Sequence, residues 1–210
     1  MPRPHQPILS RELICRTALD LMDRTGRFTL PELAHRLGVS VSSIYHHVSG
    51  RADIVEGVRG LVMGPPASVA DSADWADAVV RWARTYRGAF AAHPAAIPAL
   101  LKQTVSEPAI LAQYDALAEV LEKAGFAPDA IVVAITMLDN LCIGAAFDLA
   151  APSVVWAVDD RDSALRRALT QAGPKLNRQD RAFEDQLALI VRGLAHQLAE
   201  DASAGTAGAG

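Results

Sequence analysis

The stretch that decides the fold is residues 29–58, which read TLPELAHRLGVSVSSIYHHVSGRADIVEGV. It begins with a capping box, because the Thr29 hydroxyl can accept the backbone N–H of Glu32 while the Glu32 carboxylate reaches back to the N–H of Thr29. Pro31 falls in the first turn, where a helix needs no backbone N–H. Gly38 can end this helix with a positive φ. A first short helix is therefore expected between Thr29 and Gly38.

A second short helix is expected directly after the first. Ser40 is a natural N-cap, and Val41, Ile44 and Val48 recur at helical spacing and form its buried side. Two short helices joined by a glycine turn are the pattern of a helix-turn-helix, whose second helix enters the major groove of DNA. The sequence therefore predicts a DNA-reading helix with Val48 still on its inner face.

The outer face of this second helix has the chemistry of a nucleic-acid surface. It carries short hydroxyls, a phenol and two imidazoles, and no carboxylate that a phosphate would repel. These side chains belong to Ser42, Ser43, Tyr45, His46 and His47. Directly after them, Ser49-Gly50-Arg51 begins another helix, whose free N–H groups and positive dipole end suit a phosphate.

Residues 10–58 resemble the N-terminal domain of TetR-family transcriptional regulators, and the core LAHRLGVSVSSIYHHVSGRADI (residues 33–54) is closest to the family's signature. The resemblance implies an all-α chain in which a leading helix packs over a helix-turn-helix of three helices in all. A fourth helix then leads to a larger helical domain that binds ligands and forms a dimer.

The resemblance also implies roles for individual residues. Thr29 and Ser43 are expected to bind phosphates, Tyr45 and His47 to approach the backbone or bases, Ser42 and His46 to read bases, and Arg51 to hold a phosphate. Leu30 and Pro31 depart from the family pattern, because other members often carry a polar or basic residue there. Fewer DNA contacts are therefore expected from the first helix of the motif.

The charge of the chain is divided unevenly. Residues 1–63 contain eight Arg and Lys against six Asp and Glu, with four histidines, whereas the rest contains twelve against eighteen. A mildly basic head on an acidic body suits a protein that touches DNA with one end. Because Gly64-Pro65-Pro66 breaks the preceding helix, the predicted domains are a DNA-binding domain (1–63), a helical effector-binding and dimerisation domain (64–201) and a disordered tail (202–210).

The two cysteines, Cys15 and Cys142, lie far apart in apolar helical contexts and show no metal-binding spacing. We expect two buried, reduced thiols in a cytoplasmic protein; a redox switch is the alternative. The N-terminal MPRPHQPIL has no apolar stretch of signal-peptide length, so nothing there indicates export.

Residues 128–151, PDAIVVAITMLDNLCIGAAFDLAA, are apolar almost all round the expected helix. The length permits a transmembrane alternative, but Asp139, Asn140 and Asp148 interrupt the stretch and no basic flank follows. A buried helix is the preferred interpretation. With the amphipathic helix expected at 178–200, residues 129–150 could form a four-helix homodimer interface across a two-fold axis.

The expected ligand pocket rests on apolar and polar side chains that recur on the C-terminal helices. They are Trp82, Tyr86, Phe90, Tyr114, Met137, Asn140 and Phe147. For each of them, ordinary core packing is the alternative. Asp139 needs a partner or water in so apolar a helix, and it could serve a cationic ligand, a dimer contact or neither. Arg81, Arg84 and Arg87 lie off the apolar line of their helix and are expected to be solvated.

Motifs of the common enzyme classes are missing from the sequence: there is no GxSxG, Walker loop, GxGxxG or HExxH. We expect no catalytic residue, metal or cofactor. The resulting hypothesis is a ligand-responsive regulator, by family habit a repressor, that binds double-stranded DNA at a palindromic operator as a homodimer and is released by a small-molecule effector. The alternatives are a small-molecule-binding helical protein whose head docks a protein partner, and an enzyme of unrecognised mechanism.

Overall fold

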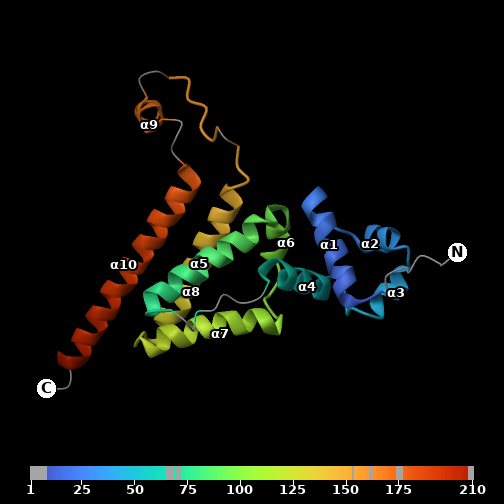
Figure 1. Cartoon of the computed structure of the whole chain (residues 1–210), viewed down its shortest axis with the longest axis horizontal. Helices are drawn as coiled ribbons and strands as arrows, with labels where there is room; N and C mark the ends of the chain where they lie inside the picture. The colour runs from blue at the N-terminus through green and yellow to red at the C-terminus, as the bar shows by residue number, and fades with distance from the viewer. Residues whose placement is uncertain are drawn as a thin grey trace. The chain divides into compact units, whose positions relative to one another are not determined.

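A computed structural model of the chain describes residues 9–64, 69, 72–152, 154–160, 163–173 and 177–207. Within these ranges the protein is all-helical and contains no strand, which confirms the predicted fold class (Figure 1). The helices in chain order are α1 (Arg11–Thr25), α2 (Leu30–Leu37), α3 (Val41–Tyr45), α4 (Arg51–Met63), α5 (Trp75–Ala91), the 3-10 turn η1 (Pro94–Ala96), α6 (Ile97–Leu100), α7 (Pro108–Lys123), α8 (Pro128–Asp148), α9 (Ala164–Ala172) and α10 (Arg178–Ala207).

These helices pack into two compact units. The first combines residues 1–68 with residues 88–117, and the second combines residues 69–87 with residues 118–210. Helices α5 and α7 each contribute residues to both units. The division differs from the domain boundary expected after residue 63, because residues 88–117 pack with the N-terminal helices. The predicted domain scheme therefore stays a prediction, and the units below are units of packing.

The first unit is built on helix α1. Ser10 caps its start by accepting the N–H of Leu13 at 3.2 Å, and Gly26 ends it in the left-handed conformation. The buried face of α1 includes Ile14, Ala18 and Met22, all fully buried, and it packs against α4 and α2. Helices α1–α4 (residues 11–63), which we call the reading head, thus share one apolar core.

Helices α1 and α4 approach each other closely at Gly57. A Cβ atom added to Gly57 would overlap the Sγ atom of Cys15, so only glycine lets the two helices meet at this distance. The Cys15 thiol is buried here, and burial raises its pKa to about 11. In the second unit, burial likewise raises the pKa of the Cys142 thiol to about 12. Both cysteines are free and buried, as expected.

The second unit is dominated by α8 and α10, which lie against each other. Helix α8 turns Ala134, Leu138 and Cys142 inward, and α10 contributes Phe183 and Leu187. The opposite face of the pair is apolar and uncovered; its exposed members are Val132, Val133, Met137 and Leu189.

In the described ranges α8 is also the one helix long and apolar enough to cross a bilayer, judged by length and composition alone. Its mean hydropathy is 2.0, yet only 28% of its most apolar window is buried within the chain. Much of the apolar surface of α8 therefore stays exposed in the single chain.

One of the arginines expected to be solvated is enclosed. The Arg87 guanidinium lies 4.5 Å over the Phe183 ring and pairs with Asp180 at 2.7 Å, leaving 11% of the side chain exposed. Arg84 pairs with Glu184 at 2.7 Å but stays exposed. The prediction for Arg87 was wrong because residues from α10, more than ninety positions away, cover this side of α5.

The C-terminal helix continues further than expected. Helix α10 runs through Ala207, whereas the sequence pattern placed its end near Glu200 and a disordered tail at 202–210. Alanines at 202, 204 and 207 favour the helical conformation, which extends the helix past the last apolar residue of its stripe. Of the expected tail, residues 208–210 lie outside the described residues.

The contact between Gly57 and Cys15 makes a testable prediction. Gly57→Ala should lower the free energy of unfolding by about 1–3 kcal/mol, because the new methyl group overpacks the α1–α4 interface. Gly88→Ala is the matched control: this α5 glycine has nothing within 4 Å of the added Cβ, so alanine should be neutral or stabilise by about 0.5–1 kcal/mol. Guanidinium titration measures both, and equal stability of Gly57→Ala and wild type would contradict the close approach.

Candidate nucleic-acid interface

The first helix of the motif is fixed by its own N-terminal residues. The Thr29 hydroxyl accepts the N–H of Glu32 at 3.3 Å, and the Thr29 N–H donates to the Glu32 carboxylate at 3.0 Å, so the expected capping box is present. The Thr29 hydroxyl also donates to Glu32 at 2.7 Å. The hydroxyl hydrogen of Thr29 is therefore already donated to Glu32. The predicted contact of Thr29 with a phosphate would require this hydrogen bond to break.

A tight turn then directs the chain into α3. Gly38 ends α2 with φ of 68°, a conformation that a residue with a side chain rarely adopts. Ser40 caps α3 by accepting the N–H of Ser43 at 3.0 Å, and the two hydroxyls lie 2.8 Å apart. This pairing holds Ser43 half-buried at the start of the helix.

Helix α3 is shorter than the pattern predicted. It ends at Tyr45, and His46 and His47 follow in a turn whose N–H groups donate to the carbonyls of Ser43 and Ile44. Ile44 is fully buried and Val48 is 4% exposed, so both ends of the segment remain anchored in the core. The expected helical register of the inner face is kept although the last turn is not α-helical.

The anchored inner face turns the polar side chains outward. Tyr45 is 52% exposed, and Ser42, His46 and His47 are exposed beside it. Four of the five side chains predicted for the outer face of the second helix are thus accessible within six residues, 42–47. Hydroxyl, phenol and imidazole groups can all donate to phosphate oxygens or to base edges.

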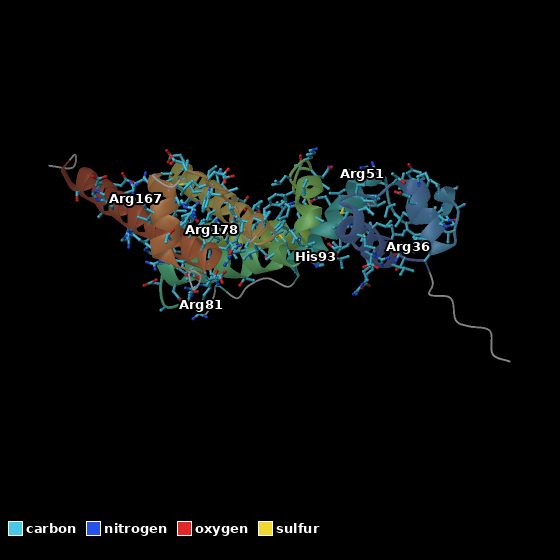
Figure 2. The ribbon with its side chains drawn as sticks, turned by 90° about the horizontal axis from the view of Figure 1, so that it is seen from above. Arg36, Arg51, Arg81, His93, Arg167 and Arg178 are labelled. Carbon is cyan, nitrogen blue, oxygen red and sulfur yellow. The ribbon has the colours of Figure 1, made fainter. Side chains whose placement is uncertain are left out.

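Arg51, the next predicted contact, is oriented by an aromatic ring. Its guanidinium lies 4.5 Å over the ring of Phe28, which is itself 3% exposed. Arg51 stays exposed on the reading head, where Arg36 also lies (Figure 2). A stacked guanidinium loses less freedom when it binds a phosphate than an unsupported one. Phe28 was missing from the sequence prediction because its partner is 23 positions away.

The start of α4 differs from expectation. The sequence placed free N–H groups there for a phosphate, but the Asp53 carboxylate accepts the N–H of Ser49 at 2.9 Å. Arg11 of α1 donates to the other oxygen of Asp53 at 3.0 Å and also reaches Glu107 at 3.0 Å. The carboxylate thus occupies one of the donors assigned to phosphate, and Arg11 balances its charge.

These donors act on the ionisation of Asp53. Burial by itself would raise the pKa of this carboxyl, but the Ser49 N–H and the Arg11 guanidinium outweigh burial and lower the pKa below its usual value. The ionised form is therefore favoured in the folded protein.

The residues expected to bind an effector differ in burial within the described protein. Trp82 and Tyr86 are buried and stacked, with ring centroids 4.5 Å apart, and Phe90 is fully buried. Tyr114 is half-buried and Phe147 is 52% exposed. Met137 and Asn140 do line one hollow of about 470 Å³ together with Leu141, Gln186, Leu189 and Ile190. The ligand-binding assignment of the seven residues stays a prediction.

A metal centre finds no support in the part of the chain that is described. Among these residues there is no group of three or more His, Cys, Asp or Glu side chains that could hold an ion. His93 instead lies 2.9 Å from Asp23, joining η1 to α1.

Comparison with known proteins decides the family. Residues 68–198 match the family model described as "Tetracyclin repressor-like, C-terminal domain". The chain belongs to the TetR family of transcriptional regulators. The family resemblance of residues 10–58 is thereby confirmed from the other end of the chain, and the protein is a DNA-binding regulator and not an enzyme.

Two relatives and one solved protein illustrate the likeness. The chain is 27% identical over 169 residues to an HTH-type transcriptional regulator of Saccharopolyspora erythraea, covering 79% of this chain and 70% of that protein. It is 23% identical over 148 residues to the HTH-type transcriptional repressor DrrR1 of Streptomyces coeruleorubidus, covering 69% of this chain and 55% of that repressor. The chain therefore spans just over half the length of DrrR1.

The fold is shared with ActR of Streptomyces coelicolor. The apo structure of ActR has a TM-score of 0.74 and 22% identity, and the likeness covers 92% of this chain and 98% of ActR. ActR has also been solved in complex with actinorhodin, with a TM-score of 0.70 and 20% identity, covering 90% of this chain and 96% of that one.

The hydrogen bonds of Asp53 predict a pH-dependent stability. A folded pKa below the usual value of about 3.9 stabilises the protein fully above that pH, and the stabilisation is lost as the pH falls through the folded pKa. Asp53→Asn should therefore be less stable than wild type at pH 7, and the difference should shrink towards pH 3.

Urea titrations from pH 7 to pH 3 measure this difference. The matched control is Asp20→Asn, on the exposed side of α1, which should follow wild type throughout. A gap between wild type and Asp53→Asn that widened on acidification would contradict the assigned hydrogen bonds.

Proposed function

We propose that this regulator is a cytoplasmic homodimeric repressor that binds a palindromic operator and is released by a small-molecule effector. The observation that carries the DNA-binding half is the surface formed by Ser42, Tyr45, His46 and His47, with Arg51 held beside it on Phe28. It places base-reading and phosphate-binding groups next to each other. The repressor DrrR1 supports the choice of repression over activation.

The division of labour among these residues follows from their chemistry. Arg51 carries a permanent charge on a fixed plane, so we assign it to a phosphate. Tyr45, Ser42 and His46 are exposed and carry directional hydrogen-bonding groups, so we assign them to base edges, with His47, Ser43 and Thr29 at the backbone. Because phosphate contacts position and base contacts specify, the first assignment governs affinity and the second governs sequence preference.

The apolar face of α8 and α10 supports the dimer. Val132, Val133 and Leu189 are each more than half exposed, and Leu189 lines a hollow together with Met137 and Asn140. Exposed apolar patches of this kind mark protein interfaces. A two-fold axis across residues 129–150 and 178–200 would bury this face as a four-helix bundle. Reading two successive major grooves would require the two α3 helices to lie about 34 Å apart, one turn of DNA.

The effector is proposed for the C-terminal helices, where Trp82, Tyr86, Phe90, Tyr114, Met137, Asn140 and Phe147 are the candidate contacts. The complex of ActR with actinorhodin supports a small molecule as the signal. By thermodynamic reciprocity, the effector must bind the DNA-free form more tightly by the same factor by which it weakens operator binding.

DNA binding is tested by selecting preferred sites from a random duplex pool and titrating the enriched duplex over a salt series. Arg51→Ala should weaken binding to all sequences and lower the slope of log K against log salt by about 0.9, because one phosphate contact is lost. His46→Ala should cost about 1–3 kcal/mol on the selected site and relax its sequence preference. Arg81→Ala, which removes an exposed arginine of α5, should change neither.

Two results would together contradict the regulator mechanism: no duplex is enriched from the random pool, and the binding of DNA does not depend on salt. They would favour a protein partner for the reading head.

The dimer is tested by charging its proposed face. Val133 is 57% exposed, so Val133→Glu should leave the fold intact but dissociate the dimer, since the carboxylate would be desolvated against the partner. Sedimentation equilibrium at micromolar protein should then report the mass of one chain. Leu111→Glu, at a leucine of α7 that is 47% exposed, is the control and should keep the wild-type mass. An unchanged mass for both variants would place the interface elsewhere.

A further inference from the structure

Two side chains of helix α4 bond to backbone groups near the end of α6 and the start of α7. Arg59 donates from Nη2 to the carbonyls of Leu100 at 2.7 Å and Gln103 at 3.1 Å, at the end of α6. Glu56 accepts with Oε2 the N–H groups of Ser106 at 2.6 Å and Glu107 at 3.1 Å, at the start of α7. Helix ends leave such carbonyl and N–H groups without partners. Here α4 supplies a partner to all four groups, and the Leu100 carbonyl also accepts the N–H of Gln103. The four groups lie in or next to residues 101–107, which we call the α6–α7 connection.

The two capping side chains also hold each other. Arg59 Nε donates to Glu56 Oε1 at 2.9 Å, and both residues are 4% exposed. Burial by itself would raise the pKa of the Glu56 carboxyl, but the Ser106 N–H and Arg59 outweigh burial and lower it. Glu56 is thus held as the anion that Arg59 and the two N–H groups require.

Stability alone is a weak explanation for this arrangement. A buried ion pair recovers little more than the cost of removing its charges from water, and apolar side chains of the same volume often stabilise as much. Directional bonds to four backbone groups give something that apolar packing does not, which is one fixed orientation of α4 relative to the connection.

Two further contacts attach α4 at its ends. At its start, Arg11 bridges Asp53 of α4 and Glu107 of the connection. At its end, the Gln113 side-chain amide donates to the carbonyl of Gly64 at 3.3 Å. Helix α4 is therefore tied to residues 100–113 along its whole length. These residues belong by sequence to the segment matched by the C-terminal family model, yet by packing they belong to the unit that contains the reading head.

We propose that Glu56 and Arg59 are positioning residues for operator binding. Their bonds to backbone groups around α6 and α7 fix the α6–α7 connection to α4, within the same packing unit as helix α3. The inference rests on the proposed function, since operator binding is the activity that this orientation serves. An effector that displaces the connection then moves α4 with it. Conversely, an operator that selects one orientation of α4 also restrains the connection.

The test is amide hydrogen exchange of full-length protein, free and bound to the duplex enriched from the random pool. In wild type, the operator should slow exchange of the Ser106 and Glu107 amides by on the order of fivefold or more, the lower range of measured couplings between sites. Pro108 has no amide hydrogen. In a peptide that ends at Pro108, Ser106 and Glu107 are therefore the last two residues whose amides exchange. Protection of residues 41–48 in the same experiment reports operator binding itself.

Arg59→Lys keeps the charge but has no planar fork to reach both carbonyls and Glu56. In the free variant, exchange in the connection should rise by about tenfold, as expected when a charge-assisted hydrogen bond is lost. The operator should still protect residues 41–48 but no longer residues 106 and 107. Glu56→Gln, a change of nearly equal volume, should give the same loss should the lysine variant fail to fold. Arg16→Lys, in the exposed Glu12–Arg16 pair of α1, is the control and should behave as wild type.

The outcomes distinguish the positioning role of Glu56 and Arg59 from the proposed function. Protection of residues 41–48 without protection of 106 and 107 in wild type would overturn the positioning role while leaving the regulator intact. So would variants that are less stable but still transmit protection, because the pair would then be structural only. Failure to enrich any duplex would overturn the proposed function and this inference with it.

Discussion

The reading head depends on how helix α4 is held between two neighbours. On one side Gly57 brings it against Cys15 of α1 at a distance that no larger residue permits. On the other side Glu56 and Arg59 bond to backbone groups around the α6–α7 connection. The first contact is apolar and non-directional, whereas the second is polar and directional. Together they fix both the distance and the rotation of the helix that follows the proposed DNA-reading segment.

The reading segment itself is organised by short-range capping. Thr29 with Glu32, and Ser40 with Ser43, satisfy the helix starts of α2 and α3 within three residues. Ile44 and Val48 then anchor the segment from beneath. Because these bonds are local, they need no help from distant parts of the chain. The orientation of Arg51 is different, since it depends on Phe28. This buried residue precedes the motif and is 23 positions from Arg51 in the sequence.

This difference explains what the sequence could predict. Capping boxes, glycine turns and apolar periodicity act over three to eight residues, so α1, α2, the turn at Gly38 and the inner face of α3 follow from the pattern. Interactions between distant residues do not. Three features show this: the cover of Arg87 by α10, the bonds of Asp53 at the start of α4, and the pairing of α4 with residues 100–107. They involve partners 41 or more positions apart, or a competing acceptor for an N–H group that the pattern left free.

The effector residues show the same limit. Trp82, Tyr86 and Phe90 recur at helical spacing in α5 and are buried, but periodicity cannot distinguish a core from a cavity. Trp82 and Tyr86 stack on each other and are buried, whereas Met137 and Asn140 line an open hollow. Which of these surfaces meets a ligand depends on space left between helices, and a linear pattern carries no measure of that space.

The brevity of α3 has a consequence for how such a protein finds its site in a chromosome. In the proposed complex, five helical residues and the turn after them would present only a handful of side chains to the groove, so each half-site would encode only a few base pairs. A genome offers on the order of a million or more competing positions, far more than so short a word can distinguish. In the proposed homodimer this short sequence would be read twice, in inverted copies at a fixed spacing. The symmetry of the site would then carry as much of the information that identifies a promoter as the contacted bases do.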